Sequence, residues 1–157
     1  MRRNVFIRAQ TGDVPLFGNN RVMPHHFFVK PRFGELDPYN HVNHAVYVAW
    51  FEAARCDALA SVDASLSSLS RQGLQMVVTD LEIGYRIPAC ADDELVIETV
   101  VTEARGVTSR WEQRLVSASD SSRVFCTAKL RVGSCDANGR PARIVPTIRI
   151  ALEKLAV

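Results

Sequence analysis

The sequence predicts an α+β domain in which a mostly antiparallel sheet of about five to six strands wraps around one long, buried helix. The first observation is a mostly apolar helical pattern that runs from about residue 43 to about residue 59. The second is a series of segments rich in Val, Ile, Thr, Tyr and Phe, which follow this helix and are separated by turn residues. A length of 157 residues fits a single domain.

The first part of the chain divides into an extension, a strand and two helices. Residues 1–24 contain Gly, Pro and Asn at intervals that break any element, so we expect an N-terminal extension there and a folded domain over residues 25–157. Residues 25–32 alternate enough for a first strand, which Pro31 stops. After the long helix, residues 61–73 have the spacing of a short second helix that Gly73 ends.

The remaining elements complete the sheet, and we expect the next four strands to form a meander. They cover residues 74–87, 94–103, 108–117 and 123–132. Residues 134–141 contain Asn138-Gly139 and predict a polar turn. Pro146 then suits the first turn of a short C-terminal helix that ends at Leu155.

Composition and charge place few limits on function. Hydrophobic residues make up 47% of the chain and charged residues 23%, as in ordinary globular proteins. The net charge of +2 argues neither for nor against nucleic acid, but no concentrated basic stripe is present, and we expect no nucleic-acid partner. No segment approaches the ~20 apolar residues of a membrane span. Met1-Arg2-Arg3 is not followed by the apolar core of a secretory signal, so we expect a cytoplasmic protein.

The cysteines give no sign of a metal site. The four are Cys56, Cys90, Cys126 and Cys135. They form no Cys-x-x-Cys pair and have no zinc-ligand spacing, so we expect free thiols in a reducing compartment and no metal.

Functional side chains are concentrated in residues 33–47, directly before and at the start of the long helix. Pro38 and Asn40 mark a turn-forming loop, and Asn43 is a good N-cap for the helix. The carboxylate of Asp37 would then lie beside the free N–H groups of a buried helix N-terminus, which can stabilise an oxyanion. This layout is typical of a reactive site.

The same residues carry a family resemblance. The run Asp-Pro-x-x-His-Val-Asn-x-x-x-Tyr, followed by Trp-Phe-Glu-x-Ala-Arg, resembles the acyl-CoA thioesterases of the hotdog fold, in the 4-hydroxybenzoyl-CoA thioesterase-like group. The resemblance covers the chain from about Phe27 onward and is strongest between Phe33 and Arg55. It implies hydrolysis of an acyl-CoA thioester to a carboxylic acid and CoA, without a metal or a redox cofactor. It also implies a homodimer or homotetramer with the acyl tunnel at a subunit boundary.

The resemblance assigns roles within the loop. Asp37 would attack the thioester carbonyl or activate the water that does so, and both alternatives remain open. The backbone amide of His44 would hold the oxyanion. His41 and Asn43 would line the site, although His41 also suits a loop histidine bonded to backbone and Asn43 a simple helix cap. Asp37 itself could serve only as an Asx-turn residue.

Three further residues have two readings each. Glu35 could share acid–base work with Asp37 but better suits a structural partner. Tyr47 is a substrate-binding candidate that equally suits core packing with its hydroxyl bonded. Arg105, in the turn after residues 94–103, is the best match to a basic loop that binds CoA phosphates in some relatives, and it also suits a solvated surface arginine. Arg86 and Arg110 are its alternatives.

Other functions receive less support. An enoyl-CoA hydratase would show Gly-Asp-x-Asn-Pro-x-His, whereas Pro38 follows Asp37 at once. A non-catalytic acyl-CoA binding module would not need the aspartate. A thioesterase acting on acyl chains carried by an acyl carrier protein remains an alternative. A serine hydrolase has no Gly-x-Ser-x-Gly elbow, and His25-His26 have no obvious carboxylate partner in the sequence.

Overall fold

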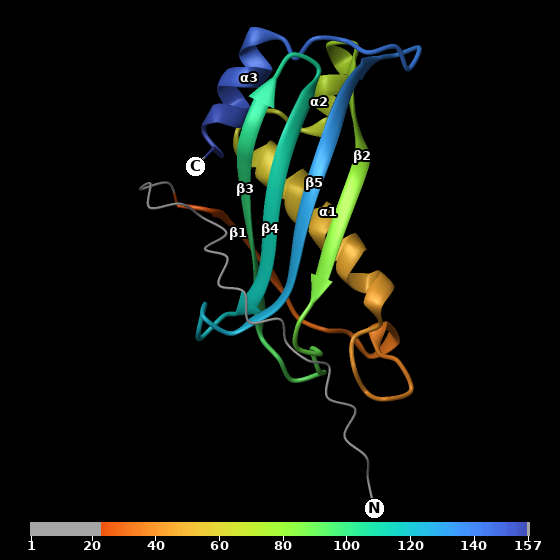
Figure 1. Ribbon diagram of the computed structural model, residues 1–157, viewed down its shortest axis with the longest axis vertical. Coiled ribbons are helices and arrows are strands. Elements are labelled where there is room, and N and C mark those ends of the chain that lie inside the picture. The colour runs from red at the N-terminus through yellow and green to blue at the C-terminus, as the bar shows by residue number, and fades with distance from the viewer. Residues whose placement is uncertain (1–22, 157) are drawn as a thin grey trace, which may run out of the picture.

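The computed structural model describes residues 23–156, which form one five-stranded antiparallel sheet with helices (Figure 1). The strands are β1 (His25–Val29), β2 (Leu74–Tyr85), β3 (Leu95–Arg105), β4 (Thr108–Ser117) and β5 (Val124–Asp136). The helices are the short 3-10 helix η1 (Phe33–Glu35) and the α-helices α1 (His44–Ser61), α2 (Leu66–Arg71) and α3 (Pro146–Glu153). The predicted α+β class, with a sheet around one long helix, is confirmed.

The order of strands across the sheet is β1-β3-β4-β5-β2. Strands β3, β4 and β5 do form a meander, but the expected meander of four strands is wrong, because β2 pairs with β5 on the far side of the sheet. The connection from β2 to β3 therefore passes the positions of β5 and β4. Strand β2 becomes an edge strand, bonded to a neighbour on one side only among the described residues.

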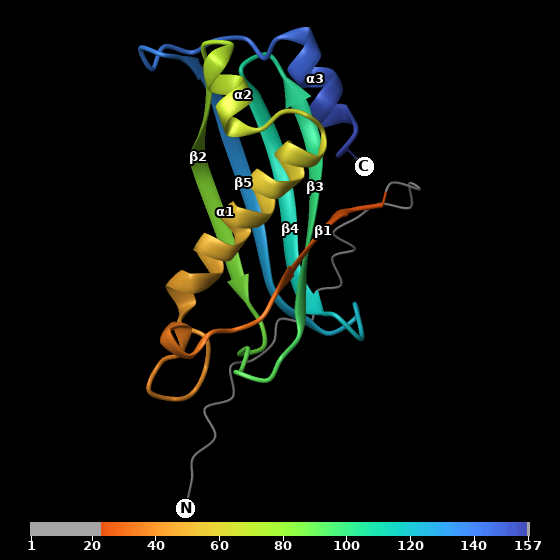
Figure 2. The same cartoon turned by 180° about the vertical axis from the view of Figure 1, so that it is seen from behind.

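The long helix lies across one face of this sheet, as the view from behind shows (Figure 2). Its apolar side chains and those of the inner sheet face form one buried cluster, which includes Phe51, Trp111 and Phe125 at 1%, 1% and 0% exposure. Burial of this much apolar surface is the main stabilising term of the domain. It also fixes the N-terminus of α1 against one end of the sheet.

The edge at β3 is shared between two segments. Strand β1 pairs with its first half, from His25 opposite Thr99 to Val29 opposite Leu95. Beyond β1, the amide of Val101 donates to the carbonyl of Leu155 at 2.8 Å, and the last described residues of the chain run along β3. Helix α3 packs its buried side chains into the same core as α1.

Most predicted boundaries agree with the structure to within a few residues. The long helix begins one residue after its predicted cap, and Gly73 has φ +72°, as a helix-ending glycine requires. There are two exceptions. Helix α2 begins only at Leu66, because Ser61 still belongs to α1. Strand β5 continues to Asp136 into the predicted polar turn, because β2 pairs with that part of it. The predicted extension over residues 1–24 lies almost entirely outside the described residues, and the division at residue 25 stays a prediction.

Within residues 23–156, every helix is too short or too polar to span a lipid bilayer. All four cysteines are free thiols. No cluster of three or more His, Cys, Asp or Glu side chains in this part of the chain is arranged to hold a metal ion.

Candidate active site

The Asp37 loop is a tight turn closed by the aspartate side chain itself. Oδ1 of Asp37 accepts from the amides of Tyr39 at 2.8 Å and His41 at 3.1 Å. The Asp37 amide donates to the His41 carbonyl at 2.7 Å, and Asn40 has φ +62°. Asparagine tolerates this left-handed conformation. The half-buried carboxylate is thus held by one oxygen, and no described group donates a hydrogen bond to Oδ2.

The start of α1 leaves one amide without an acceptor. The Asn43 side chain accepts from the Ala45 amide at 3.0 Å, so its predicted N-cap role is confirmed, and the Asn43 carbonyl accepts from Val46 at 2.9 Å. The amide of His44, the first residue of the helix, donates to no acceptor among residues 23–156. A free N–H at a helix N-terminus attracts negative charge. This is the amide predicted to hold an oxyanion.

The segment after β2 supports the loop from the other side. The Val42 amide donates to the Ala89 carbonyl at 2.8 Å, and His41 forms a bridge with Cys90. His41 is half-buried, and its backbone is bonded to Asp37 in both directions. The loop that carries Asp37 is therefore fixed to the end of the sheet as well as to α1.

Two tyrosines connect the start of α1 with the end of β2 and the segment that follows it. Tyr47 is 3% exposed, and its hydroxyl accepts from the Ala89 amide at 3.1 Å. Tyr85, at the end of β2, packs edge-on against Tyr47 with ring centroids 5.4 Å apart, and its hydroxyl donates to the His44 carbonyl at 2.9 Å. Burial raises the pKa of both phenols, so both stay protonated at neutral pH. Core packing of Tyr47 agrees with one of its two readings, and a substrate contact stays a prediction.

Glu35 has structural partners. Its carboxylate accepts from the Arg32 amide at 2.8 Å and from the indole Nε1 of Trp50 at 3.3 Å. Its carbonyl accepts from the Asn43 amide at 2.8 Å. A carboxylate with both oxygens occupied by N–H donors is poorly placed to act as an acid towards a substrate, which favours the structural reading.

The basic candidates for CoA binding lie in three different places. Arg105 lies at the end of β3 beside the β3–β4 turn, at the opposite end of the sheet from the Asp37 loop (Figures 1 and 2). Arg86 directly follows β2, at the same end of the sheet as the loop, and its amide donates to the Phe125 carbonyl at 2.9 Å. Within one copy of the chain, Arg86 is therefore the candidate nearer to Asp37 along the sheet. A CoA contact by Arg105 stays a prediction.

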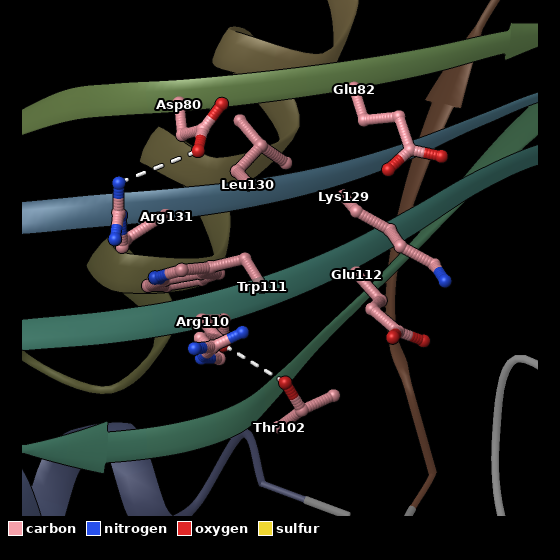
Figure 3. A pocket seen from close by; sticks show the side chains of 9 residues that line it. All are labelled: Asp80, Glu82, Thr102, Arg110, Trp111, Glu112, Lys129, Leu130 and Arg131. Carbon is pink, nitrogen blue, oxygen red and sulfur yellow. Dashed lines mark hydrogen bonds and ion pairs between the residues drawn. The ribbon is translucent and has the colours of Figure 1, made fainter.

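The third candidate, Arg110, lies on the sheet face that points away from α1. It borders a hollow of about 230 Å³ lined by charged side chains of neighbouring strands (Figure 3). Arg110 forms an ion pair with Glu103 at 3.1 Å, and Arg131 forms one with Asp80 at 3.4 Å. Opposite charges thus largely neutralise one another here, and the sheet separates this hollow from α1.

His25 does have a carboxylate partner, contrary to the sequence interpretation. Its Nε2 lies 2.7 Å from Oδ2 of Asp57, and its Nδ1 lies 3.4 Å from Oγ of Ser61. The partner is far along the chain, on α1, which explains why the sequence did not reveal it. The Ser61 hydroxyl donates to the Ala58 carbonyl at 2.7 Å. A serine whose proton is given to a carbonyl is not activated as a nucleophile.

Sequence reasoning missed two contributors to the site, Tyr85 and the segment at Ala89. Both reach the Asp37 loop through contacts with α1 or the residues just before it, more than forty positions away in the chain. An aromatic residue at the end of a predicted strand was the only available signal, and it fits many strands equally well.

Comparisons with known proteins give one consistent result. Residues 31–152 match the model of the family described as the thioesterase-like superfamily. A protein of Haemophilus influenzae named acyl-CoA thioesterase YbgC is 37% identical over 91 residues, which cover 57% of this chain and 67% of that protein. A protein of Escherichia coli O6:H1 named acyl-CoA thioester hydrolase YbgC is 33% identical over 93 residues, with 59% and 69% covered.

The fold has solved counterparts. The structure of YbaW, described as a probable thioesterase from Escherichia coli, superposes with a TM-score of 0.72 at 26% sequence identity. The superposition covers 85% of this chain and 99% of that one. Nearly the whole of that protein is therefore similar to the sheet and helices described above.

Proposed function

The chain belongs to the thioesterase-like superfamily, and on this premise we propose that it hydrolyses acyl-CoA thioesters to a free carboxylic acid and CoA, with Asp37 as nucleophile or general base. The observation that carries the proposal is local. Among the described residues, the half-buried Asp37 carboxylate is held by one oxygen only, and its loop leads within seven residues to the His44 amide at the start of α1, which has no acceptor in this part of the chain.

The reaction is balanced by water alone. In the general-base route, the oxygen of water bonds to the acyl carbon, the carbon–sulfur bond breaks, and the proton that water gives up passes to the departing thiolate of CoA. In the nucleophile route, an oxygen of Asp37 displaces the thiolate to form an acyl anhydride, and water then cleaves this anhydride, which restores Asp37 and releases the acid. The negative charge that develops on the carbonyl oxygen is stabilised by a hydrogen bond that the His44 amide donates. Removal of one such donor typically costs about 10²–10³ in rate.

The remaining candidates shape the pocket. His41 and Asn43 follow Asp37 in the loop, and we assign them the orientation of water and of the helix N-terminus. Tyr47 is buried next to this loop. Any contact that it makes with substrate uses its ring, because its hydroxyl is bonded to the Ala89 amide. Hydrolysis of this kind requires no metal and no redox cofactor.

We propose a homodimer or homotetramer, because β2 is a long edge strand with apolar side chains in solvent. Val77, Val78, Leu81 and Tyr85 are 49%, 43%, 38% and 45% exposed. Exposed strand edges of this kind are normally covered. In a two-fold arrangement about β2, one copy would bring its Arg105 end towards the Asp37 end of the other, which would unite a catalytic loop with a basic turn. The acyl tunnel would lie at this boundary.

The free state of all four cysteines supports a reducing compartment, and we place the activity in the cytoplasm.

The experiment is a free-thiol release assay over a panel of short, long and aromatic acyl-CoA esters. Wild type is expected to release CoA from at least one class, and Asp37→Asn is expected to release far less while remaining folded. If no CoA ester releases a free thiol but an acylated carrier protein does, the substrate is an acyl chain bound to the carrier protein. Binding of acyl-CoA without any release would replace the enzyme by a binding module.

A further inference from the structure

Both carboxylate oxygens of Glu35 are used to fasten the Asp37 loop. Oε2 accepts from the Arg32 amide before the loop, and Oε1 accepts from Nε1 of Trp50, which lies on α1 and is 8% exposed. The Glu35 carbonyl also accepts from the amide of Asn43, the helix cap. One residue thereby joins the entry of the loop, the helix cap and the body of the helix.

Trp50 extends these connections to the other side of the loop. Its ring lies 5.8 Å from that of Tyr47, whose hydroxyl holds the Ala89 amide. The Ala89 carbonyl in turn accepts from Val42, at the exit of the loop. The loop is thus held at its entry by Glu35 and at its exit by Ala89, and both contacts depend on side chains of α1.

Asp37 follows Glu35 by two residues, and it has no direct contact with α1 through its side chain among the hydrogen bonds of the described residues. Its Oδ1 bonds are all made within the loop. The distance between its free oxygen and the helix N-terminus therefore depends on how the loop as a whole is seated. Glu35 and Trp50 make the only side-chain hydrogen bond within residues 23–156 that joins residues 32–42 to α1 beyond its first turn.

We propose that the Glu35–Trp50 pair is a positioning element that sets Asp37 against the start of α1, so that the carboxylate and the His44 amide face the same acyl carbon. This inference rests on the proposed thioesterase function. Glu35 acts through Asp37 and does not touch the reacting atoms. A displacement of about 1 Å at a reacting group can cost about 10²-fold in rate, so the pair acts mainly on kcat.

Two substitutions separate the hydrogen bond from packing. Trp50→Phe removes the N–H donor and keeps an aromatic ring. Glu35→Gln replaces one acceptor oxygen by an NH₂ group, which meets an N–H donor whichever way the amide is turned. Each variant is expected to lower kcat by about tenfold to a hundredfold with KM within about twofold of wild type.

The control is Trp111→Phe. Trp111 is 1% exposed, and its Nε1 donates to Oγ of Ser109 at 2.9 Å in the core. This variant loses an indole hydrogen bond of the same kind far along the sheet from Asp37. It is expected to lower the melting temperature without lowering kcat. A fall in kcat equal to that of Trp50→Phe would mean that general destabilisation explains both, and would overturn the proposal.

The double variant tests whether the two residues act through one contact. In Glu35→Gln, the amide NH₂ opposes the N–H of either Arg32 or Trp50. In the double variant the introduced side-chain amide can turn its oxygen to the Arg32 amide, and no N–H then remains opposite its NH₂. The double variant is therefore expected to be at least as active as Glu35→Gln alone. Multiplication of the two single effects would contradict the proposal. The pH profile of kcat/KM should keep its shape in Glu35→Gln, whereas loss of one limb would make Glu35 a catalytic acid or base.

A readout independent of catalysis distinguishes this inference from the function it rests on. The chain has two tryptophans, so the two indole N–H resonances can be assigned from Trp50→Phe and Trp111→Phe. Glu35→Gln is expected to shift the Trp50 resonance only. If this shift occurs but wild type hydrolyses no thioester, the proposed function fails while the contact stands. If wild type is active and the shift or the loss of kcat is absent, the positioning role alone is wrong.

Discussion

Asp37 and Asp136 hold the same set of hydrogen bonds in two separate turns. Oδ1 of Asp37 accepts from the amides two and four residues later at 2.8 and 3.1 Å, and Oδ1 of Asp136 does so at 2.8 and 2.9 Å. The residue three positions on has positive φ in both turns, at Asn40 (+62°) and Gly139 (+76°). The turn alone therefore does not make a site. Only the turn at Asp37 leads into the N-terminus of a long helix.

This pair provides a matched test of the catalytic aspartate. Asp37→Asn is expected to lower kcat for thioester hydrolysis by about 10²–10⁴, because a positioned base or nucleophile is lost. Asp136→Asn makes the same chemical change in the second turn, which has the same hydrogen bonds, and should leave kcat near that of wild type. Thiol release under saturating substrate measures both. Equal losses in the two variants would assign the effect to turn stability.

Asn40 tests how much of the activity depends on loop conformation. Asn40→Ala should destabilise the loop by about 1 kcal/mol, because alanine is disfavoured at a φ of +62°, whereas Asn40→Gly should be nearly neutral. We expect the alanine variant to lose activity beyond its loss of stability. The counterpart is Gly139→Ala at φ +76°, which should lower the melting temperature but not kcat. Thermal unfolding and kinetics of the three variants decide this.

Leu81→Lys tests the association of copies through β2. Leu81 is 38% exposed on the sheet face that α1 covers, and a lysine there would bring like charges together in a two-fold interface. We expect sedimentation velocity to show monomer, with loss of hydrolysis. Ile150→Lys makes a similar change at a 56% exposed position of α3 and should leave the oligomer intact. A monomeric wild type would refute the interface outright.

The raised pKa of Glu112 predicts that the stability of the fold depends on pH. Burial raises the pKa of its carboxyl, and the nearby Lys129 ammonium opposes this to a lesser degree. A raised pKa in the folded state means that the stabilisation from the protonated form is present below the ordinary value of about 4.3 and is lost as pH rises through the folded value. Glu112→Gln should therefore raise the melting temperature at neutral pH, and the gain should vanish on acidification. A gain that grows with acidity would contradict the sign.

Cys126 should be the least reactive thiol of the chain. Burial raises the pKa of its thiol to about 12, so very little thiolate exists at neutral pH. A thiol reagent is expected to modify the half-buried Cys90 and Cys135 first and Cys126 only after denaturation. Peptide mapping of the native protein gives the order. Rapid native modification of Cys126 would mean that β5 opens readily.

The sequence predicted those features that depend on neighbours in the chain. The apolar spacing after Asn43 and its side-chain oxygen were enough to place α1 and its cap, and Pro38 with Asn40 was enough to predict the turn at Asp37. In each case the deciding interactions span a few residues, so local propensity and the final structure agree.

Features that depend on residues far apart in the chain could not be predicted from the sequence. Strand β2 alternates as well for pairing with β3 as with β5, and only the packing of the whole sheet on α1 selects β5. The bond from Tyr85 to the His44 carbonyl and that from Glu35 to Trp50 join side chains whose approach depends on the complete fold. The position of Arg105 relative to Asp37 likewise follows from strand direction, which periodicity does not reveal.

The two edges of the sheet differ in a way that limits how far copies of the chain can add to one another. The first half of β3 is paired with β1, and the amide of Val101 donates to the carbonyl of Leu155. Within residues 23–156, this edge therefore has few backbone groups available to pair with a second copy of the chain. Strand β2, twelve residues long, has no strand on its outer side within the same described range. A chain with one unpaired edge strand can pair with one other copy through it, and the β2 edges of both copies are then covered. If copies associate through β2 as proposed, lateral growth is expected to stop at the pair, which would prevent the formation of fibres through this edge.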